Sequence, residues 1–157
     1  MISSTANSRV KHVVQLREKG RERKKEGVFL AEGIRMFQET PVGRIRELYM
    51  EETLAERPQT EDFSEKIEAC RQAGIFVETV SSEVMKKMAD TMSPQGVLVV
   101  AEMFAYQPEE LIREAVKRRE QEGRDPLFLL LEDVQDPGNL GTMIRTAEGA
   151  GADGIFM

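Results

Sequence analysis

Three residues near the carboxyl end of the chain have types and a spacing that could handle phosphate or a hydroxyl group. Asn139, Gly141 and Arg145 lie in the stretch NLGTMIR. The asparagine amide can both donate and accept hydrogen bonds, and the arginine guanidinium offers a rigid fork of donors that suits phosphate. If the stretch is helical, Arg145 lies between one and two turns after Asn139. A purely structural interpretation stays open, with Asn139 capping the helix and Arg145 facing solvent.

A strand and a polar loop precede this stretch and would position it. The nearly unbroken apolar run LFLLLEDV, residues 127–134, predicts a strand buried on both faces of a parallel sheet. We expect the next helix to begin near Leu140, with Asn139 as its N-cap. Loops at the carboxyl ends of such strands bind ligands. A dinucleotide site is disfavoured, because the loop has only Gly138 and Gly141 and lacks the Gly-x-Gly-x-x-Gly pattern.

The rest of the chain predicts a mixed α/β fold. Short apolar runs bounded by glycine, proline or charged residues predict strands, and amphipathic stretches between them predict helices. The predicted strands are 27–33, 44–50, 75–80 and 95–103, and the predicted helices include 8–25 and 61–74, the latter with Ile67 and Cys70 facing inward. We expect three regions: a substrate domain over 1–105, a helical linker over 106–126, and an α/β domain that starts at 127–157.

Charge is distributed unevenly along the chain. The net charge is -6, but residues 1–35 hold nine basic and four acidic side chains, and the remainder holds 13 basic and 24 acidic ones. Basic side chains of the amino-terminal segment could form a face that contacts phosphate: Arg9, Lys11, Arg21, Arg23, Lys24 and Lys25. The alternative is a solvated helix surface, in which glutamates at helical spacing pair with these cations.

Composition narrows the setting and the chemistry. No apolar run approaches the roughly 20 residues of a membrane helix, and the first residues lack the apolar core of a signal peptide. The single cysteine, Cys70, excludes an internal disulfide, and a single histidine, His12, argues against a zinc cluster. We therefore expect a cytoplasmic protein without a metal site and without a membrane partner.

Two parts of the chain resemble one known family. The stretch LEDVQDPGNLGTMIRTAEGAGADGI, from Leu131 to Ile155, resembles the first signature segment of the SpoU (TrmH-like) class of SPOUT RNA ribose 2′-O-methyltransferases. NSRVKHVVQL, RKKEGVFLAEG and SPQGVLVVAE resemble, in order, the substrate-binding domain that precedes catalysis in many members. The resemblance implies an amino-terminal mixed α/β substrate-binding domain, followed by the first βαβ unit of a parallel-sheet methyltransferase domain of the trefoil-knot type.

The resemblance also implies a reaction. Family members transfer the methyl group of S-adenosyl-L-methionine to a ribose 2′-hydroxyl of ribosomal or transfer RNA. By matching position, Arg145 would act on the hydroxyl and Asn139 would help to set its geometry. Because the pKa of arginine exceeds about 12, we expect Arg145 to hold the adjacent phosphate and orient the hydroxyl rather than accept its proton. The expected partners are structured RNA and, for a complete enzyme, a second copy. The alternative is a non-catalytic RNA-binding α/β module.

The resemblance makes one further expectation about the carboxyl end. Family members continue with two more signature segments, which line the cofactor site and form a deep trefoil knot, and neither follows Met157 in this sequence. We therefore expect a piece truncated before the knot, inactive alone and unable to bind S-adenosyl-L-methionine. The residues that would bind the cofactor stay unknown.

Overall fold

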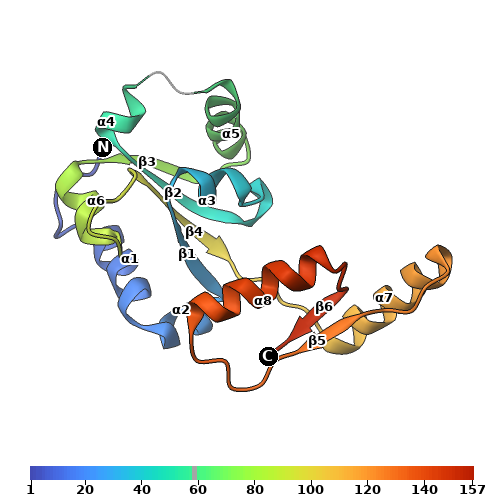
Figure 1. The fold of residues 1–157 in the computed structure, drawn as a ribbon. Coiled ribbons are helices and arrows are strands. Elements are labelled where there is room, and N and C mark those ends of the chain that lie inside the picture. The colour runs from blue at the N-terminus through green and yellow to red at the C-terminus, as the bar shows by residue number, and fades with distance from the viewer. Residues whose placement is uncertain (58–59) are drawn as a thin grey trace. The chain divides into compact units, whose positions relative to one another are not determined.

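A computed structural model describes residues 1–57 and 60–157 of the chain. The chain divides into two compact units, Met1–Met103 and Phe104–Met157. A four-stranded sheet forms the centre of the first unit (Figure 1). The strand order is β1-β4-β2-β3. The strands are β1 (Val28–Glu32), β2 (Ile45–Glu51), β3 (Phe76–Val80) and β4 (Val97–Glu102). Strand β4 pairs antiparallel with β1 and β2, whereas β2 and β3 are parallel. The four predicted strands are therefore confirmed.

Strand β4 divides the core of this unit into two halves. Its sequence VLVVAE is apolar on both faces, because Val97 and Val99 point into one hydrophobic cluster and Leu98 and Val100 point into the other. A register shift between Ile45 and Glu47 in β2 lets successive parts of that strand keep apolar side chains on the buried faces. Both faces of the sheet consequently need a covering layer of helices.

Helices cover each face in turn (Figure 1). The helical segments of this unit are α1 (Ser8–Glu18), α2 (Gly20–Glu26), α3 (Ile34–Glu39), the 3-10 turn η1 (Val42–Arg44), α4 (Glu52–Ala55), α5 (Glu61–Gln72) and α6 (Ser82–Met88). Phe37 of α3 and Phe63 of α5 pack edge to face with 5.2 Å between ring centroids. Ile67 and Cys70 of α5 are buried in the same cluster, as predicted.

The opposite face is covered by α1 and α6, whose buried side chains include Val10, Val13 and Leu16. The prediction of one helix over residues 8–25 is wrong, because Lys19 is extended and separates α1 from α2. The buried stripe ends at Leu16, and α2 has no buried residue. Beyond that point nothing apolar would hold a continued helix against the sheet.

The second unit contains the predicted βαβ arrangement. Its elements are α7 (Pro108–Glu122), β5 (Phe128–Leu130), α8 (Pro137–Gly149) and β6 (Gly154–Phe156). Strands β5 and β6 are parallel, and α8 connects them. The expectation that this first strand is buried on both faces is wrong for the described residues, because Leu130 is 77% exposed. In the described part of the chain β5 has one neighbouring strand, so one edge and part of its surface stay open.

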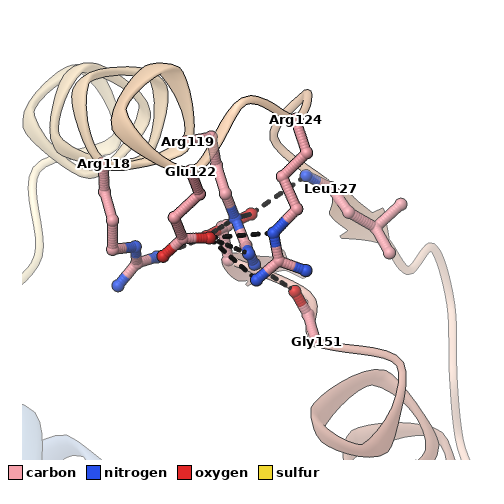
Figure 2. A network of polar contacts seen from close by, with 7 residues as sticks. Arg118, Arg119, Glu122, Arg124, Leu127 and Gly151 are labelled. Carbon is pink, nitrogen blue, oxygen red and sulfur yellow. Dashed lines mark hydrogen bonds and ion pairs between the residues drawn. The ribbon is translucent and has the colours of Figure 1, made fainter.

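Helix α7, predicted as a linker, belongs to this second unit. Arg119 of α7 is only 5% exposed, and its Nε donates to both carboxylate oxygens of Asp153 at 2.8 Å. The same carboxylate accepts from Arg118 and from the Leu127 backbone N–H at 3.0 Å, and Arg119 also donates to the Gly151 carbonyl oxygen (Figure 2). One buried carboxylate thus joins α7 to the start of both strands.

Candidate functional site

The loop before α8 is shaped by a cap one turn earlier than the sequence predicted. Asp136, not Asn139, is the N-cap, and its Oδ1 accepts from the Asn139 backbone N–H at 2.6 Å. The helix begins at Pro137 rather than near Leu140, because proline fits the first helical position, where its missing N–H costs nothing. A side chain at Gly138 would lie 3.1 Å from the capping oxygen, so glycine leaves room for the cap.

Arg145 is exposed and lies along the helix surface. Its Nη2 donates to Thr142 Oγ1 at 3.2 Å, and the Thr142 hydroxyl donates to the Gly138 carbonyl at 3.0 Å. A Cβ atom at Gly141 would be 3.3 Å from Arg145 Nη1, so the guanidinium occupies the space that this glycine leaves open. The side chain therefore runs back toward the start of α8, where helix N–H groups and the helix dipole attract anions.

Asn139 and Arg145 lie on the same helix but not on the same side of it. Both side chains are exposed. Six residues of α-helix separate their directions by about 120° around the axis. No hydrogen bond joins the two side chains within the part of the chain that the structure describes. Thr142 and Gly141, three and four residues before Arg145, are instead its neighbours, and the sequence signal for both was their helical spacing.

A cavity of about 420 Å³ lies beside β5 and α8. Its lining is Leu127, Phe128, Leu129, Leu131, Thr142, Met143, Thr146, Ala147, Ala150 and Ala152. This lining contains two threonine hydroxyls and no charged side chain. S-adenosyl-L-methionine carries an ammonium, a carboxylate and a polar adenosine, which need hydrogen-bonding partners when buried. The lining of this cavity does not fit that cofactor.

Five of the six predicted cations of the basic amino-terminal segment are exposed, and within the described residues four of these five have no ion pair shorter than 3.7 Å. Lys11, Lys24 and Lys25 are exposed, and Arg21 is 92% exposed beside Glu22 at 3.7 Å. An ion pair of that length on the surface contributes little to stability. These four side chains are therefore free to meet an anionic partner.

Arg9, in contrast to these four cations, is held by contacts with neighbouring side chains. Its Nη1 donates to Glu47 Oε1 at 3.0 Å, and its guanidinium carbon lies 3.8 Å from the centroid of the Phe76 ring. The Tyr49 hydroxyl donates to the other oxygen of Glu47. Burial, together with this hydrogen bond to Glu47, raises the pKa of Tyr49 above its usual value, so the tyrosine stays a neutral donor. Arg9 thus already has an acceptor and an aromatic face.

Arg17 and Arg23 donate hydrogen bonds to backbone carbonyl oxygens near the junction of α1 and α2. Arg23 Nη1 donates to the carbonyl oxygens of Leu16 and Arg17 at 2.6 and 2.8 Å, which satisfies the open end of α1. Arg17 Nη1 donates to the carbonyl oxygens of Lys87 and Ala89 at 3.0 and 2.8 Å. This second contact brings the exposed Lys86 and Lys87 of α6 to the end of α1, and the sequence had not grouped them with the basic segment.

The single histidine and the single cysteine both lie in surroundings that give them a structural role. His12 Nε2 lies 3.0 Å from Glu26 Oε1, which joins α1 to the end of α2, and Cys70 is a buried free thiol. Residues 1–57 and 60–157 contain no cluster of three histidine, cysteine, aspartate or glutamate side chains that could hold a metal ion. Within the same ranges, every helix is too short or too polar to span a bilayer.

The architecture matches a class of RNA-modifying enzymes. The family model of the MRM3-like substrate binding domain matches residues 7–99, which lie within the first unit. The βαβ arrangement of the second unit follows it in the order found in methyltransferases of known structure.

Individual relatives extend the match across both units. The chain is 32% identical to the 23S rRNA (guanosine(2553)-2′-O)-methyltransferase RlmP of Bacillus subtilis over 99% of this chain and 53% of that protein. An AdoMet-bound rRNA methyltransferase from Sinorhizobium meliloti aligns with a TM-score of 0.71 and 30% identity, over 98% of this chain and 52% of the other. The SpoU methyltransferase AviRb from Streptomyces viridochromogenes shares the fold at a TM-score of 0.65 and 24% identity.

The chain belongs to the SpoU (TrmH-like) class of RNA methyltransferases, and its first unit is an MRM3-like substrate-binding domain. It spans about half the length of the relatives that it matches.

Proposed function

We propose that this chain supplies the RNA-binding unit and the first catalytic segment of an RNA ribose 2′-O-methyltransferase that uses S-adenosyl-L-methionine and acts on ribosomal or transfer RNA. The observation that carries the proposal is the continuous similarity to rRNA methyltransferases over 98–99% of the chain, which spans both units. We further propose a cytoplasmic enzyme that pairs as a homodimer when complete. Both of these statements rest on family membership.

In this proposal Arg145 positions the RNA. The exposed guanidinium, fixed by Thr142 and directed along α8, would bind a phosphate next to the reacting ribose and hold the 2′-hydroxyl in place. A guanidinium with a pKa above about 12 is a poor proton acceptor, so its contribution is geometric and electrostatic. Asn139, at the first turn of the same helix, would contact the RNA from another side.

The exposed lysines of the amino-terminal segment are expected to contribute phosphate contacts. Replacing Lys11, Lys24 and Lys25 together by alanine should weaken binding to a 23S ribosomal RNA transcript by about tenfold or more. It should also reduce the slope of log affinity against log salt by about two to three. Filter binding over a series of salt concentrations measures both quantities.

A second triple variant controls for net charge. Replacing Arg35, Arg71 and Lys117 by alanine also removes three exposed positive charges, but from α3, α5 and α7. Its salt slope should stay close to that of the unmodified chain. Equal losses in the two variants, or an affinity that does not change with salt, would contradict RNA binding by the basic segment.

The chain as given is expected not to bind the cofactor. Titration with S-adenosyl-L-methionine in a calorimeter should show no saturable heat, because the cavity beside α8 offers no partner for the charged ends of the molecule. The Sinorhizobium meliloti relative, whose structure was solved with AdoMet bound, is the positive control. A saturable isotherm with the present chain would show that its residues do form a cofactor site.

A further inference from the structure

A second cavity of about 270 Å³ lies in the first unit. Its lining combines apolar and charged side chains: Arg17, Arg23, Phe29, Leu30, Glu32, Met88, Asp90 and Leu98. Strand β1 is an edge strand of the sheet, and its residues Phe29 and Leu30, whose side chains pack on opposite faces, both line this cavity. The cavity thus has an apolar floor and a charged rim.

Both arginines of the rim are held in fixed positions by the backbone. Arg17 spans the ends of α1 and α6, and Arg23 closes the end of α1, each through two carbonyl oxygens. These bonds use the Nη1 group of each guanidinium, and Arg17 Nη2 also donates to Glu18. A guanidinium held in this way loses little conformational entropy when a planar group stacks on it.

The acidic side of the rim is also rigid. The carboxylate of Glu32 accepts from the backbone N–H groups of Asp90 and Thr91 at 2.9 and 3.3 Å, and from the Thr91 hydroxyl. This contact fixes the turn after α6. The Asp90 carboxylate itself is exposed and has no hydrogen-bond or ion-pair partner among the described residues. Asp90 therefore offers a free acceptor at the cavity, beside a Glu32 whose oxygens are already occupied.

We propose that this cavity binds an unpaired nucleobase of the RNA substrate, an inference that rests on the proposed function. The ring would lie on the apolar floor against a guanidinium plane, and Asp90 would accept a hydrogen bond from an exocyclic amino or ring N–H group. RNA is read in this way where unpaired bases stack on aromatic or arginine planes and expose their edges.

The charges of the rim favour a base over a phosphate. A phosphate would face the Asp90 carboxylate, which lines the cavity, and like charges repel. A base presents donors as well as acceptors, so it can use both the carboxylate and the remaining guanidinium N–H groups. The apolar side chains of the floor would gain nothing from an anion, whereas a ring face can be buried against them.

Magnetic resonance of the whole chain can locate such binding. The probes are the four ribonucleoside 5′-monophosphates, with ribose 5-phosphate as the control that lacks a base. At least one nucleotide should shift the Nε–H signals of Arg17 and Arg23 and the amide of Thr91, while ribose 5-phosphate should leave them unchanged. Equal shifts from ribose 5-phosphate, or no shift at these groups with any nucleotide, would overturn the proposal.

The variant Asp90→Lys separates a base from a phosphate. It should weaken nucleotide binding by about tenfold or more, because a charged acceptor is lost. If the cavity held phosphate, the same variant would bind more tightly, which would contradict the inference. Asp62→Lys, the same change on the exposed surface of α5, should have no effect.

The outcome is separable from that of the proposed function. If 23S ribosomal RNA binds in a salt-dependent way but no nucleotide shifts the signals at the cavity, the proposed base site is refuted. The proposed RNA methyltransferase function is then unaffected. A nucleotide response at Arg17, Arg23 and Thr91 that is lost in Asp90→Lys supports the base site, and the lysine variants test RNA binding by the basic segment separately.

Discussion

Replacing Arg145 by alanine is expected to lower methyl transfer to RNA by at least about a hundredfold in an enzyme that joins this chain to the carboxyl-terminal half of the Bacillus subtilis relative. The size follows from the positioning role, because a misplaced reacting group can cost that factor without any change in the fold. Incorporation of radioactive methyl groups from S-adenosyl-L-methionine into ribosomal RNA measures the rate.

The structure offers matched controls for this variant. Arg145 is exposed, so its removal should leave the circular dichroism and thermal unfolding of the protein unchanged. Arg113→Ala removes an exposed arginine from α7 and should keep full activity. Thr142→Val removes the hydroxyl that accepts from Arg145 and should give an intermediate loss. Turnover that survives in Arg145→Ala would refute the positioning role.

The sheet of the first unit could be predicted from the sequence because its strands carry their own signal. Uninterrupted apolar runs, such as Val97 to Val100 in β4, whose side chains are all buried, specify a strand covered on both faces wherever they pair. The break at Lys19 could not be predicted from helix periodicity. It depends on where the sheet stops offering a buried surface and on a contact from Arg23 back to the Leu16 carbonyl.

The candidate site was predictable in part. Arg145 is exposed, which fits both the predicted site and a helix residue that simply faces solvent. The cap is Asp136 rather than the predicted Asn139, and Asp136 followed by Pro137 carries the stronger signal for a helix start. The link between Arg17 and the end of α6 could not be predicted, because it joins residues about seventy positions apart. Only the packing of α1 and α6 on one sheet face brings Lys86 and Lys87 to the basic segment.

The second large effect is expected from Asp153→Asn, which should release α7 from the rest of its unit. The Asp153 side chain has no exposed surface, and its carboxylate accepts hydrogen bonds from two arginines and one backbone N–H. An amide keeps the shape but loses the charge, so the buried Arg119 would lose its buried counterion and keep Glu122, which is 2.8 Å from Nη1 and 40% exposed. Amide exchange in α7 should lose protection by at least about tenfold, as local opening becomes easier.

A nearby aspartate gives the control for this variant. Asp125→Asn makes the same chemical change at an exposed position and should leave the exchange of α7 unchanged. Unaltered protection of α7 in Asp153→Asn would mean that the apolar contacts of α7, such as Leu111 against Gly154, suffice to hold the helix.

Acid should reproduce the effect of this substitution in the unmodified protein. The hydrogen bond from Arg119, supported by the Leu127 N–H and Arg118, lowers the pKa of Asp153 to about 2. The unfolded value is about 3.9, so the unfolded state takes up the proton first as the pH falls. The stabilisation is therefore complete above about pH 4 and is lost as the pH falls toward 2. Protection factors in α7 should decline over that window in the unmodified chain, and the difference from Asp153→Asn should disappear at its acid end, because protonated Asp153 is as uncharged as asparagine.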